Sequence, residues 1–203
     1  MTKKIVIFLH GVGSSGADLE RLGDYWASSM PDVAFLAPNG PFPFDQGNGY
    51  QWFSISGVNE VNRAIRVHDA RAALDKTLSD LLLEHGATWE KDQIVLVGFS
   101  QGTIMSLDVV ASNRLPVHAV VGFSGRLASP QPHEVNTRAP LLLIHGKADP
   151  VIPFSETEKA AQQLKAQGAK VTTLFEDGIP HTISQQGAER AAQFIRQCFD
   201  ISE

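Results

Sequence analysis

Three short segments of the chain carry side chains that could act together in nucleophilic catalysis. Residues 98–102 read GFSQG, with Ser100 at the centre of a G-x-S-x-G pattern. Asp149 follows within HGKADP, and His181 follows later within PHTIS. In such a set the histidine removes the serine proton, and the carboxylate orients the histidine and stabilises its cationic form. The pentapeptide alone is a weak signal in a chain with 17 glycines, so its surroundings must decide.

The residues around Ser100 fit a sharp turn between a strand and a helix. The apolar run QIVLV precedes the pattern, and the helix-like TIMSLDVVA follows it. Such a turn strains its central residue and tolerates only small neighbours, as at Gly98 and Gly102. It would expose the Ser100 hydroxyl at the N-terminus of a helix, where free N–H groups favour developing negative charge. Ser124 lies in a similar GFSG segment, but Arg126 stands in place of the second glycine, which disfavours Ser124 as the nucleophile.

The elements that must position these segments alternate along the chain. Strands are expected in KIVIFLH, VAFLAP, QIVLVGF, HAVVGFS, PLLLIHG and KVTTLFE, and helices near residues 18–29, 59–84, 102–112, 155–167 and 184–198. Continuous apolar runs indicate strands covered on both faces, and their alternation with helices predicts a parallel sheet. Ser100, Asp149 and His181 then follow C-terminal ends of strands, in the chain order of an α/β-hydrolase triad. We predict a single α/β-hydrolase domain over residues 1–203, with about six strands and helices on both faces.

Other side chains compete for the roles of acid and base. Asp177 lies four residues before His181 and is the alternative to Asp149, which is favoured because it ends its own strand. His145 is the alternative base. It precedes the candidate acid on the same turn, where it would be poorly placed to bridge to Ser100.

The glycine-rich segment after the first strand has two interpretations. It contains Gly11-x-Gly13-x-x-Gly16, the form of a dinucleotide-binding fingerprint. That interpretation requires an acid after the second strand to bind the ribose, where this chain has Asn39. Alternatively, the backbone N–H groups of Val12 and Gln101 form an oxyanion hole, in which each donor contributes about 3–4 kcal/mol. The absent acid and the complete triad favour the oxyanion hole.

A long loop over residues 39–57 is rich in glycine, proline and aromatic residues. Long loops in compact domains are commonly functional. This loop could form the wall of an acyl pocket, with Phe42, Phe44, Trp52 and Phe53 against the substrate. It could equally be an apolar flap that covers a sheet edge, and the sequence leaves both interpretations open.

Composition limits the class of protein. A chain of 203 residues with 43% hydrophobic content can form one buried core, and a net charge of −5 argues against nucleic-acid binding. No apolar stretch reaches the length of a membrane span, and no signal peptide is recognised, so we expect a cytoplasmic protein without stable membrane insertion. Cys198 is the sole cysteine and is expected to be a buried structural thiol. The chemistry requires neither a metal nor an organic cofactor.

Four ordered motifs, LHGVG, GFSQG, HGKADPVIP and PHTIS, resemble those of the phospholipase/carboxylesterase family of α/β-hydrolases, which includes the acyl-protein thioesterases. The resemblance covers nearly the whole chain. It implies Ser100 as nucleophile, His181 as base and Asp149 as the orienting acid, with oxyanion donors from Val12 and Gln101. It also implies hydrolysis of carboxylic esters through an acyl-enzyme, with acyl thioesters or lysophospholipids as alternative substrates.

Two features distinguish this chain within the resemblance. QWFS, GVNEVN and FSGRLAS are most similar to small bacterial carboxylesterases, and the aromatic loop would suit short or medium acyl chains. Thioesterase-like members usually have Asp after the WF element that lies beside the acyl site, whereas Ser54 follows Trp52 and Phe53 here. The chain also begins close to the strand that carries His10, so we expect a sheet trimmed of two N-terminal strands.

Overall fold

Six apolar runs form the strands of one parallel sheet in the computed structural model, which describes residues 1–202. The strands are β1 (Lys4–Leu9), β2 (Val33–Leu36), β5 (Gln93–Phe99), β6 (Ala119–Phe123), β7 (Leu141–Gly146) and β8 (Val171–Glu176). Their order across the sheet is β2-β1-β5-β6-β7-β8. All six predicted strands are confirmed. Because β1 and β5 are neighbours, the loops that follow them face each other at the same edge of the sheet.

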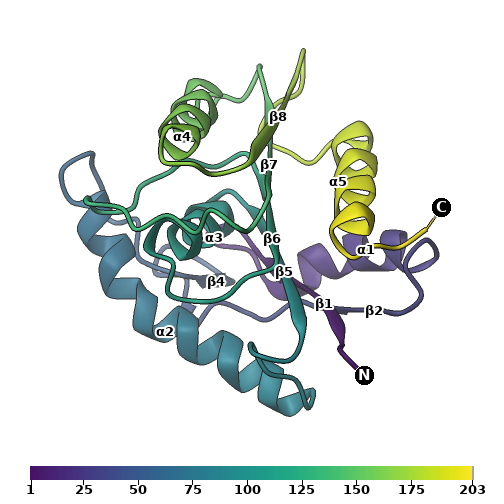
Figure 1. Cartoon of the computed structure of the whole chain (residues 1–203). Coiled ribbons are helices and arrows are strands. Elements are labelled where there is room, and N and C mark those ends of the chain that lie inside the picture. The colour runs from purple at the N-terminus through teal and green to yellow at the C-terminus, as the bar shows by residue number, and fades with distance from the viewer. Residues whose placement is uncertain (203) are drawn as a thin grey trace.

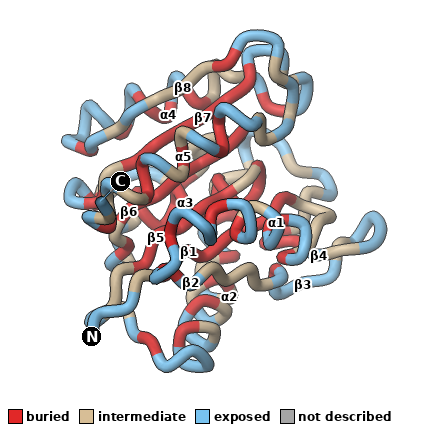
Figure 2. The backbone as a smooth tube through the Cα atoms, turned by 90° about the vertical axis from the view of Figure 1, so that its right-hand side faces the viewer, coloured by how far each residue is buried: buried red, intermediate tan, exposed pale blue. Residues whose placement is uncertain are grey.

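Five helices cover both faces of this sheet (Figure 1). One face carries α1 (Gly16–Ala27) and α5 (Gln185–Cys198), and the other carries α2 (Arg63–Glu84), α3 (Gln101–Ser112) and α4 (Ser155–Ala166). Alternate residues of each strand point into separate cores: Ile5 and Ile7 pack on one side, and Val6 and Phe8 on the other. Burial on both faces explains why the strands are continuously apolar. Figure 2 shows this buried centre with exposed outer helix faces and loops.

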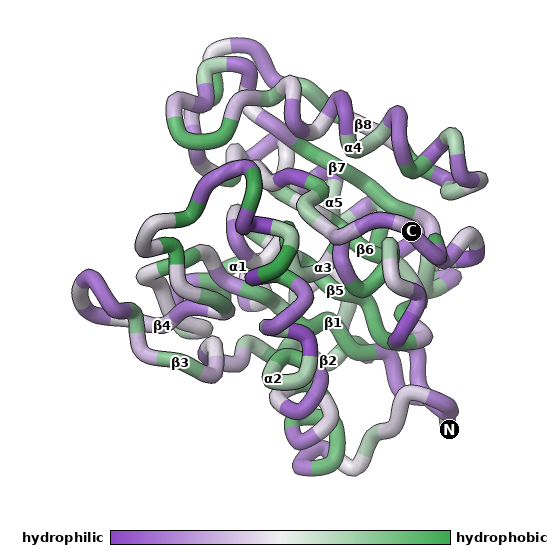
Figure 3. Tube along the Cα trace, turned by 90° about the vertical axis from the view of Figure 1, so that its left-hand side faces the viewer, coloured by the Kyte–Doolittle hydropathy of each residue, from purple (hydrophilic) through white to green (hydrophobic). Residues whose placement is uncertain are grey.

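The helix predicted from residue 59 begins four residues later, at Arg63. The Asn59 side chain accepts hydrogen bonds from the N–H groups of Val61 and Asn62, which form a turn instead of a helical repeat. Gly86 follows the C-terminus of this helix in the left-handed conformation, with a φ of 60°, as glycine commonly does after a helix. The central strands are mainly hydrophobic, whereas the helices mix hydrophilic and hydrophobic residues (Figure 3). Within residues 1–202 none of the helices is long and apolar enough to cross a membrane.

A buried ion-pair network joins α2 to α3. The Asp108 carboxylate is fully buried and accepts two hydrogen bonds from Arg71, at 2.8 and 2.9 Å. Nη1 of Arg114 donates to Asp108 at 2.8 Å, and Nε of the same residue binds Asp75. Two guanidinium groups therefore compensate one buried carboxylate.

Asp108→Ala is expected to lower the free energy of unfolding by about 3–5 kcal/mol, because Arg71 and Arg114 lose their common buried partner. The measurement is urea unfolding followed by tryptophan fluorescence. Asp80→Ala provides the control, since the exposed pair of Asp80 with Lys76 should contribute no more than about 0.5 kcal/mol. Equal stability of the Asp108 variant and the wild type would show that the network contributes nothing.

Candidate active site

Ser100 lies on the sharp turn from β5 into α3. Its backbone has φ 53° and ψ −115°, a strained conformation for a residue with a side chain. A Cβ atom added at Gly98 would lie 2.5 Å from the backbone nitrogen of Thr103. A Cβ atom added at Gly102 would lie 1.8 Å from the carbonyl oxygen of Leu9. The predicted need for small residues on both sides of Ser100 is therefore confirmed, and backbone contact is its cause.

Ser100, His181 and Asp149 form one chain of hydrogen bonds. Nε2 of His181 lies 3.0 Å from the Ser100 Oγ, and its Nδ1 lies 2.7 Å from Asp149 Oδ2. A ring nitrogen that faces a carboxylate carries the proton of the neutral imidazole. Nε2 of His181 is therefore unprotonated and can accept a hydrogen bond from the Ser100 hydroxyl. The Asp149 side chain is fully buried, while that of His181 is 18% exposed. The structure thus brings together the three residues that the sequence singled out.

The Asp149 carboxylate is held in its charged form. Its Oδ1 accepts hydrogen bonds from the backbone N–H groups of Val151 and Ile152, at 2.8 and 3.0 Å. Burial acts to raise the pKa of Asp149, but the hydrogen bonds from His181, Ile152 and Val151 outweigh it and lower the pKa below its usual value. Asp149 is therefore ionised at neutral pH.

The loop that carries His181 is fixed against the turn that carries Asp149. The Ala148 N–H donates to the Ile179 carbonyl at 3.0 Å, and a Cβ atom at Gly146 would lie 2.0 Å from that same oxygen. The ring of Phe99 packs against the His181 ring, with 4.9 Å between the centroids. These contacts position the imidazole before any substrate binds.

The competing residues have other partners. Asp177 is exposed and pairs with Lys147, with 2.9 Å between Nζ and Oδ1. His145 is fully buried, and its Nδ1 lies 2.7 Å from the Thr157 hydroxyl. Ser124 shares the left-handed backbone of Ser100, with φ 52°, but no histidine within residues 1–202 forms a hydrogen bond with its side chain. The geometry therefore favours Ser100, His181 and Asp149 over these competing residues.

The loop after β1 lies beside Ser100, where a Cβ atom at Gly11 would be 3.5 Å from the Ser100 Cβ. His10 holds this loop: its Nε2 accepts from the Gly40 N–H at 2.8 Å, so its Nδ1 donates to the Gly11 carbonyl at 2.7 Å. Desolvation lowers the pKa of His10, which keeps the ring neutral. Within residues 1–202 the Val12 N–H has no hydrogen-bond acceptor, and Gln101 begins a helix, where N–H groups lack intrahelical partners. Both groups are free to bind an oxyanion.

The same loop is not arranged to bind a dinucleotide. The Gly16 N–H donates to the Asn39 side chain at 2.9 Å, and the Ser15 N–H donates to the Asp18 carboxylate at 3.2 Å. Those donors, which a pyrophosphate would need, are occupied by side chains of the protein. A Cβ atom at Gly16 would lie 1.9 Å from the Ala37 carbonyl oxygen, so this glycine permits close packing of α1. The structure does not support the dinucleotide interpretation.

The aromatic loop contains a short hairpin, β3 (Phe42–Pro43) and β4 (Tyr50–Gln51). Trp52 and Phe53 are buried in the core that faces α2, whereas Phe42 is 43% exposed. Phe44 covers the β1–α1 loop, with its ring 3.1 Å from the position of a Cβ atom on Gly13. A cavity of about 410 Å³ is lined by Phe42, Gln51, Trp52, Phe53, Ser54, Arg66, Asp69 and Ala70. The loop therefore both covers the core and borders a cavity.

The side chain of Gln101 has a role that the sequence did not predict. Its Oε1 accepts from the Trp52 N–H at 2.8 Å, and its Nε2 donates to the Phe53 carbonyl at 2.8 Å. The Trp52 indole donates to the His10 carbonyl at 2.9 Å. The residue after Ser100 thus fastens the aromatic loop to the site. A buried amide in the otherwise mainly apolar α3 was the available signal.

Gln101→Ala is expected to reduce kcat/KM by about tenfold and stability by about 1–3 kcal/mol, because two buried backbone groups lose their partners and the aromatic loop loosens. The backbone N–H of residue 101 is retained. Steady-state kinetics and urea unfolding measure the two effects. Gln46→Ala removes an exposed hydrogen bond to Ser56 in the same loop and should change neither value appreciably. Wild-type values for both variants would contradict this role of the Gln101 side chain.

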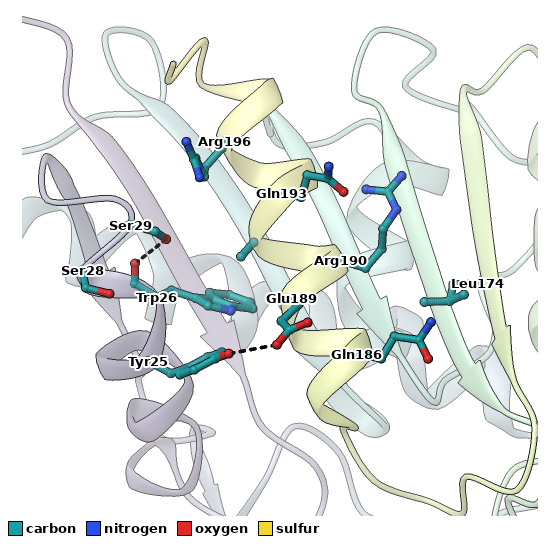
Figure 4. A pocket seen from close by; sticks show the side chains of 11 residues that line it. Tyr25, Trp26, Ser28, Ser29, Leu174, Gln186, Glu189, Arg190, Gln193 and Arg196 are labelled. Carbon is teal, nitrogen blue, oxygen red and sulfur yellow. Dashed lines mark hydrogen bonds between the residues drawn. The ribbon is translucent and has the colours of Figure 1, made fainter. Parts of the chain in front are cut away.

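A separate groove of about 600 Å³ lies between α1 and α5 (Figure 4). Tyr25 donates to Glu189 across it at 3.4 Å, and the Trp26 indole donates to the Ala188 carbonyl at 3.0 Å. Neither Ser100 nor any residue hydrogen-bonded to it lines this groove. The candidate active site is therefore confined to the C-terminal edge of the sheet.

The chain is similar over nearly its whole length to proteins already described. A family model described as Phospholipase/Carboxylesterase matches residues 1–199. Esterase YpfH of Escherichia coli (strain K12) is 30% identical over 200 residues, which cover 96% of this chain and 82% of that protein. Acyl-protein thioesterase 1 of Gibberella zeae is 27% identical over 211 residues, 95% of this chain and 89% of that protein. The crystal structure of esterase PE8 matches with a TM-score of 0.87 and 36% identity, covering 97% of this chain and 93% of that chain.

Proposed function

The chain belongs to the phospholipase/carboxylesterase family, and from this premise we propose that it is a serine hydrolase that cleaves carboxylic esters of short to medium acyl chain length. The observation that carries this proposal is the hydrogen-bonded chain from Ser100 through His181 to Asp149 at the C-terminal edge of the sheet. Similarity to two esterases at 30% identity or more further supports an ester substrate.

In the first half of the reaction Ser100 Oγ attacks the acyl carbon while Nε2 of His181 takes its proton. Asp149 stabilises the resulting imidazolium, and the N–H groups of Val12 and Gln101 hold the tetrahedral oxyanion. His181 then donates the proton to the leaving oxygen as the bond between that oxygen and the acyl carbon breaks. An alcohol departs and the acyl group remains on Ser100.

In the second half water takes the place of the alcohol. His181 removes a proton from the water as its oxygen attacks the acyl carbon, and the same two N–H groups hold the oxyanion. Collapse of this intermediate breaks the bond to Ser100, whose oxygen recovers a proton from His181. Each step uses only protein groups and water.

The aromatic loop supports a short or medium acyl group. Trp52 and Phe53 form a buried apolar wall that Gln101 fastens beside Ser100, and Phe42 stands at the exposed rim of the neighbouring cavity. Phe44 packs over the β1–α1 loop and would shape the site from that side. An acyl thioester is the second candidate substrate, since the Gibberella zeae relative is a thioesterase by name.

We place this activity in the cytoplasm, on small-molecule substrates. The net charge of −5 gives no surface excess for nucleic acid. Burial, together with the nearby Asp200 carboxylate, raises the pKa of the Cys198 thiol to about 11, as expected for an inert thiol in a protein without disulfides.

A panel of aryl esters and acyl thioesters with graded chain lengths tests the proposal. The expected result is the highest kcat/KM on short and medium esters, with a rapid initial release of about one equivalent of alcohol per enzyme. Faster hydrolysis of thioesters than of matched esters would reassign the substrate class. Absence of turnover on every member of the panel would contradict the proposed activity.

A further inference from the structure

A fourth side chain touches the Ser100–His181–Asp149 chain. Nε2 of His145 lies 3.2 Å from Asp149 Oδ2, the same oxygen that faces His181. We infer that His145 is a positioning residue, which holds the Asp149 carboxylate in place for His181 through the close contact of its Nε2–H with Oδ2. The inference rests on the function proposed above and adds a residue to its machinery.

The neighbours of His145 determine which of its nitrogens carries the proton. Nε2 faces two acceptors, the Ile152 carbonyl at 2.8 Å and the ionised Asp149 carboxylate. Neither group can donate, so Nε2 must carry a hydrogen. Nδ1 lies 2.7 Å from Oγ1 of Thr157, whose hydroxyl can donate to it. A neutral ring with its proton on Nε2 therefore accepts from Thr157 and directs its one N–H toward the Ile152 carbonyl and Asp149.

The charge state of His145 suits this role. The ring is fully buried, and desolvation lowers its pKa against the opposing effects of the Ile152 carbonyl and Asp149. Asp149 and His181 are the titratable groups that act on it electrostatically. A neutral His145 donates a hydrogen bond without placing a second cation beside His181, which must itself become positive during the reaction.

With His145 included, three hydrogen bonds and one further N–H contact surround the Asp149 carboxylate. Val151 and Ile152 donate to Oδ1 and His181 donates to Oδ2, while the Nε2–H of His145, which also faces the Ile152 carbonyl, lies against Oδ2. These contacts surround both carboxylate oxygens, and the side chain is fully buried, so water cannot replace a lost N–H group. Without His145 the carboxylate loses one of the two groups that hold Oδ2 in place. The expected effect is on kcat, because His145 is enclosed and does not meet substrate.

His145→Gln and His145→Asn are a matched pair for the test. The Gln amide can reach the position of Nε2, whereas the shorter Asn amide reaches only that of Nδ1. We expect His145→Asn to lower kcat on an aryl ester by about 10- to 100-fold with KM within about twofold, as for loss of one hydrogen bond to a charged group. His145→Gln should recover kcat to within about fivefold of wild type. Equal losses in both variants, or none in His145→Asn, would overturn the inference.

The Asp149→Asn background separates positioning from general damage. If His145 acts through the carboxylate, adding His145→Asn to Asp149→Asn should reduce kcat by less than about twofold further. The same loss in both backgrounds would show that His145 acts elsewhere, and thermal unfolding midpoints identify any variant that fails to fold. Failure of the proposed function gives a different result, because Ser100→Ala would then retain turnover. Failure of the inference about His145 alone leaves Ser100→Ala inactive.

Discussion

Ser100→Ala is expected to lower kcat for an aryl ester by about 10⁵- to 10⁶-fold, because no acyl-enzyme can form and only the oxyanion donors remain. The Ser100 Oγ is the hydroxyl within hydrogen-bond distance of His181, at 3.0 Å. Its replacement removes only the hydroxyl oxygen of one small side chain and leaves Gly98 and Gly102 in place. The fold should therefore persist. Steady-state hydrolysis measures the loss of kcat. Mass spectrometry of protein treated with a fluorophosphonate measures the expected loss of covalent labelling.

Ser124→Ala is the matched control for this variant. Ser124 follows the neighbouring strand β6, and its φ of 52° resembles the 53° of Ser100. It lacks a histidine partner within the described part of the chain, so its variant should keep kcat within about threefold and react with the probe as the wild type does. Equal labelling of Ser100→Ala and wild type, or loss of labelling in Ser124→Ala, would refute the assignment of the nucleophile.

The residues that could be predicted from the sequence are those whose positions follow from the sheet. Apolar runs identify parallel strands, and the ends of parallel strands meet at one edge, so a residue that follows a strand can be placed without knowledge of its contacts. Ser100 follows β5 and Asp149 lies just beyond β7. Both are found where this rule places them, and the expected contact of His181 with each is present.

The features that could not be predicted are polar contacts between segments far apart in the chain. The amide of Gln101 binds backbone groups 48 and 49 residues away, and nothing in helical periodicity identifies those partners. In the sequence Asn39 marks only the position where a dinucleotide site needs an acid, whereas in the structure its side chain accepts a hydrogen bond from the Gly16 N–H at the N-terminus of α1. Aromatic residues in a loop have the same composition whether they line a pocket or cover a core, and Trp52 is in contact with both.

Asp149→Asn is expected to lower kcat by about 10⁴-fold, and the hydrogen bonds to this side chain explain so large an effect. An amide has one oxygen where the carboxylate has two. If that oxygen stays with Val151 and Ile152, the amide NH₂ faces Nδ1 of His181, which must then become an acceptor. The proton of the neutral ring moves to Nε2, and His181 can no longer accept the proton of Ser100.

Asp177→Asn distinguishes this tautomer effect from a change of charge near the site. Asp177 is exposed and paired with Lys147, so its variant should retain kcat within about twofold while losing the same formal charge. Both variants are measured on one aryl ester over a range of pH, because a change of tautomer lowers kcat at every pH. A larger loss in Asp177→Asn than in Asp149→Asn would transfer the role of the acid to Asp177. Unchanged kcat in both would mean that His181 keeps its working tautomer without a carboxylate partner.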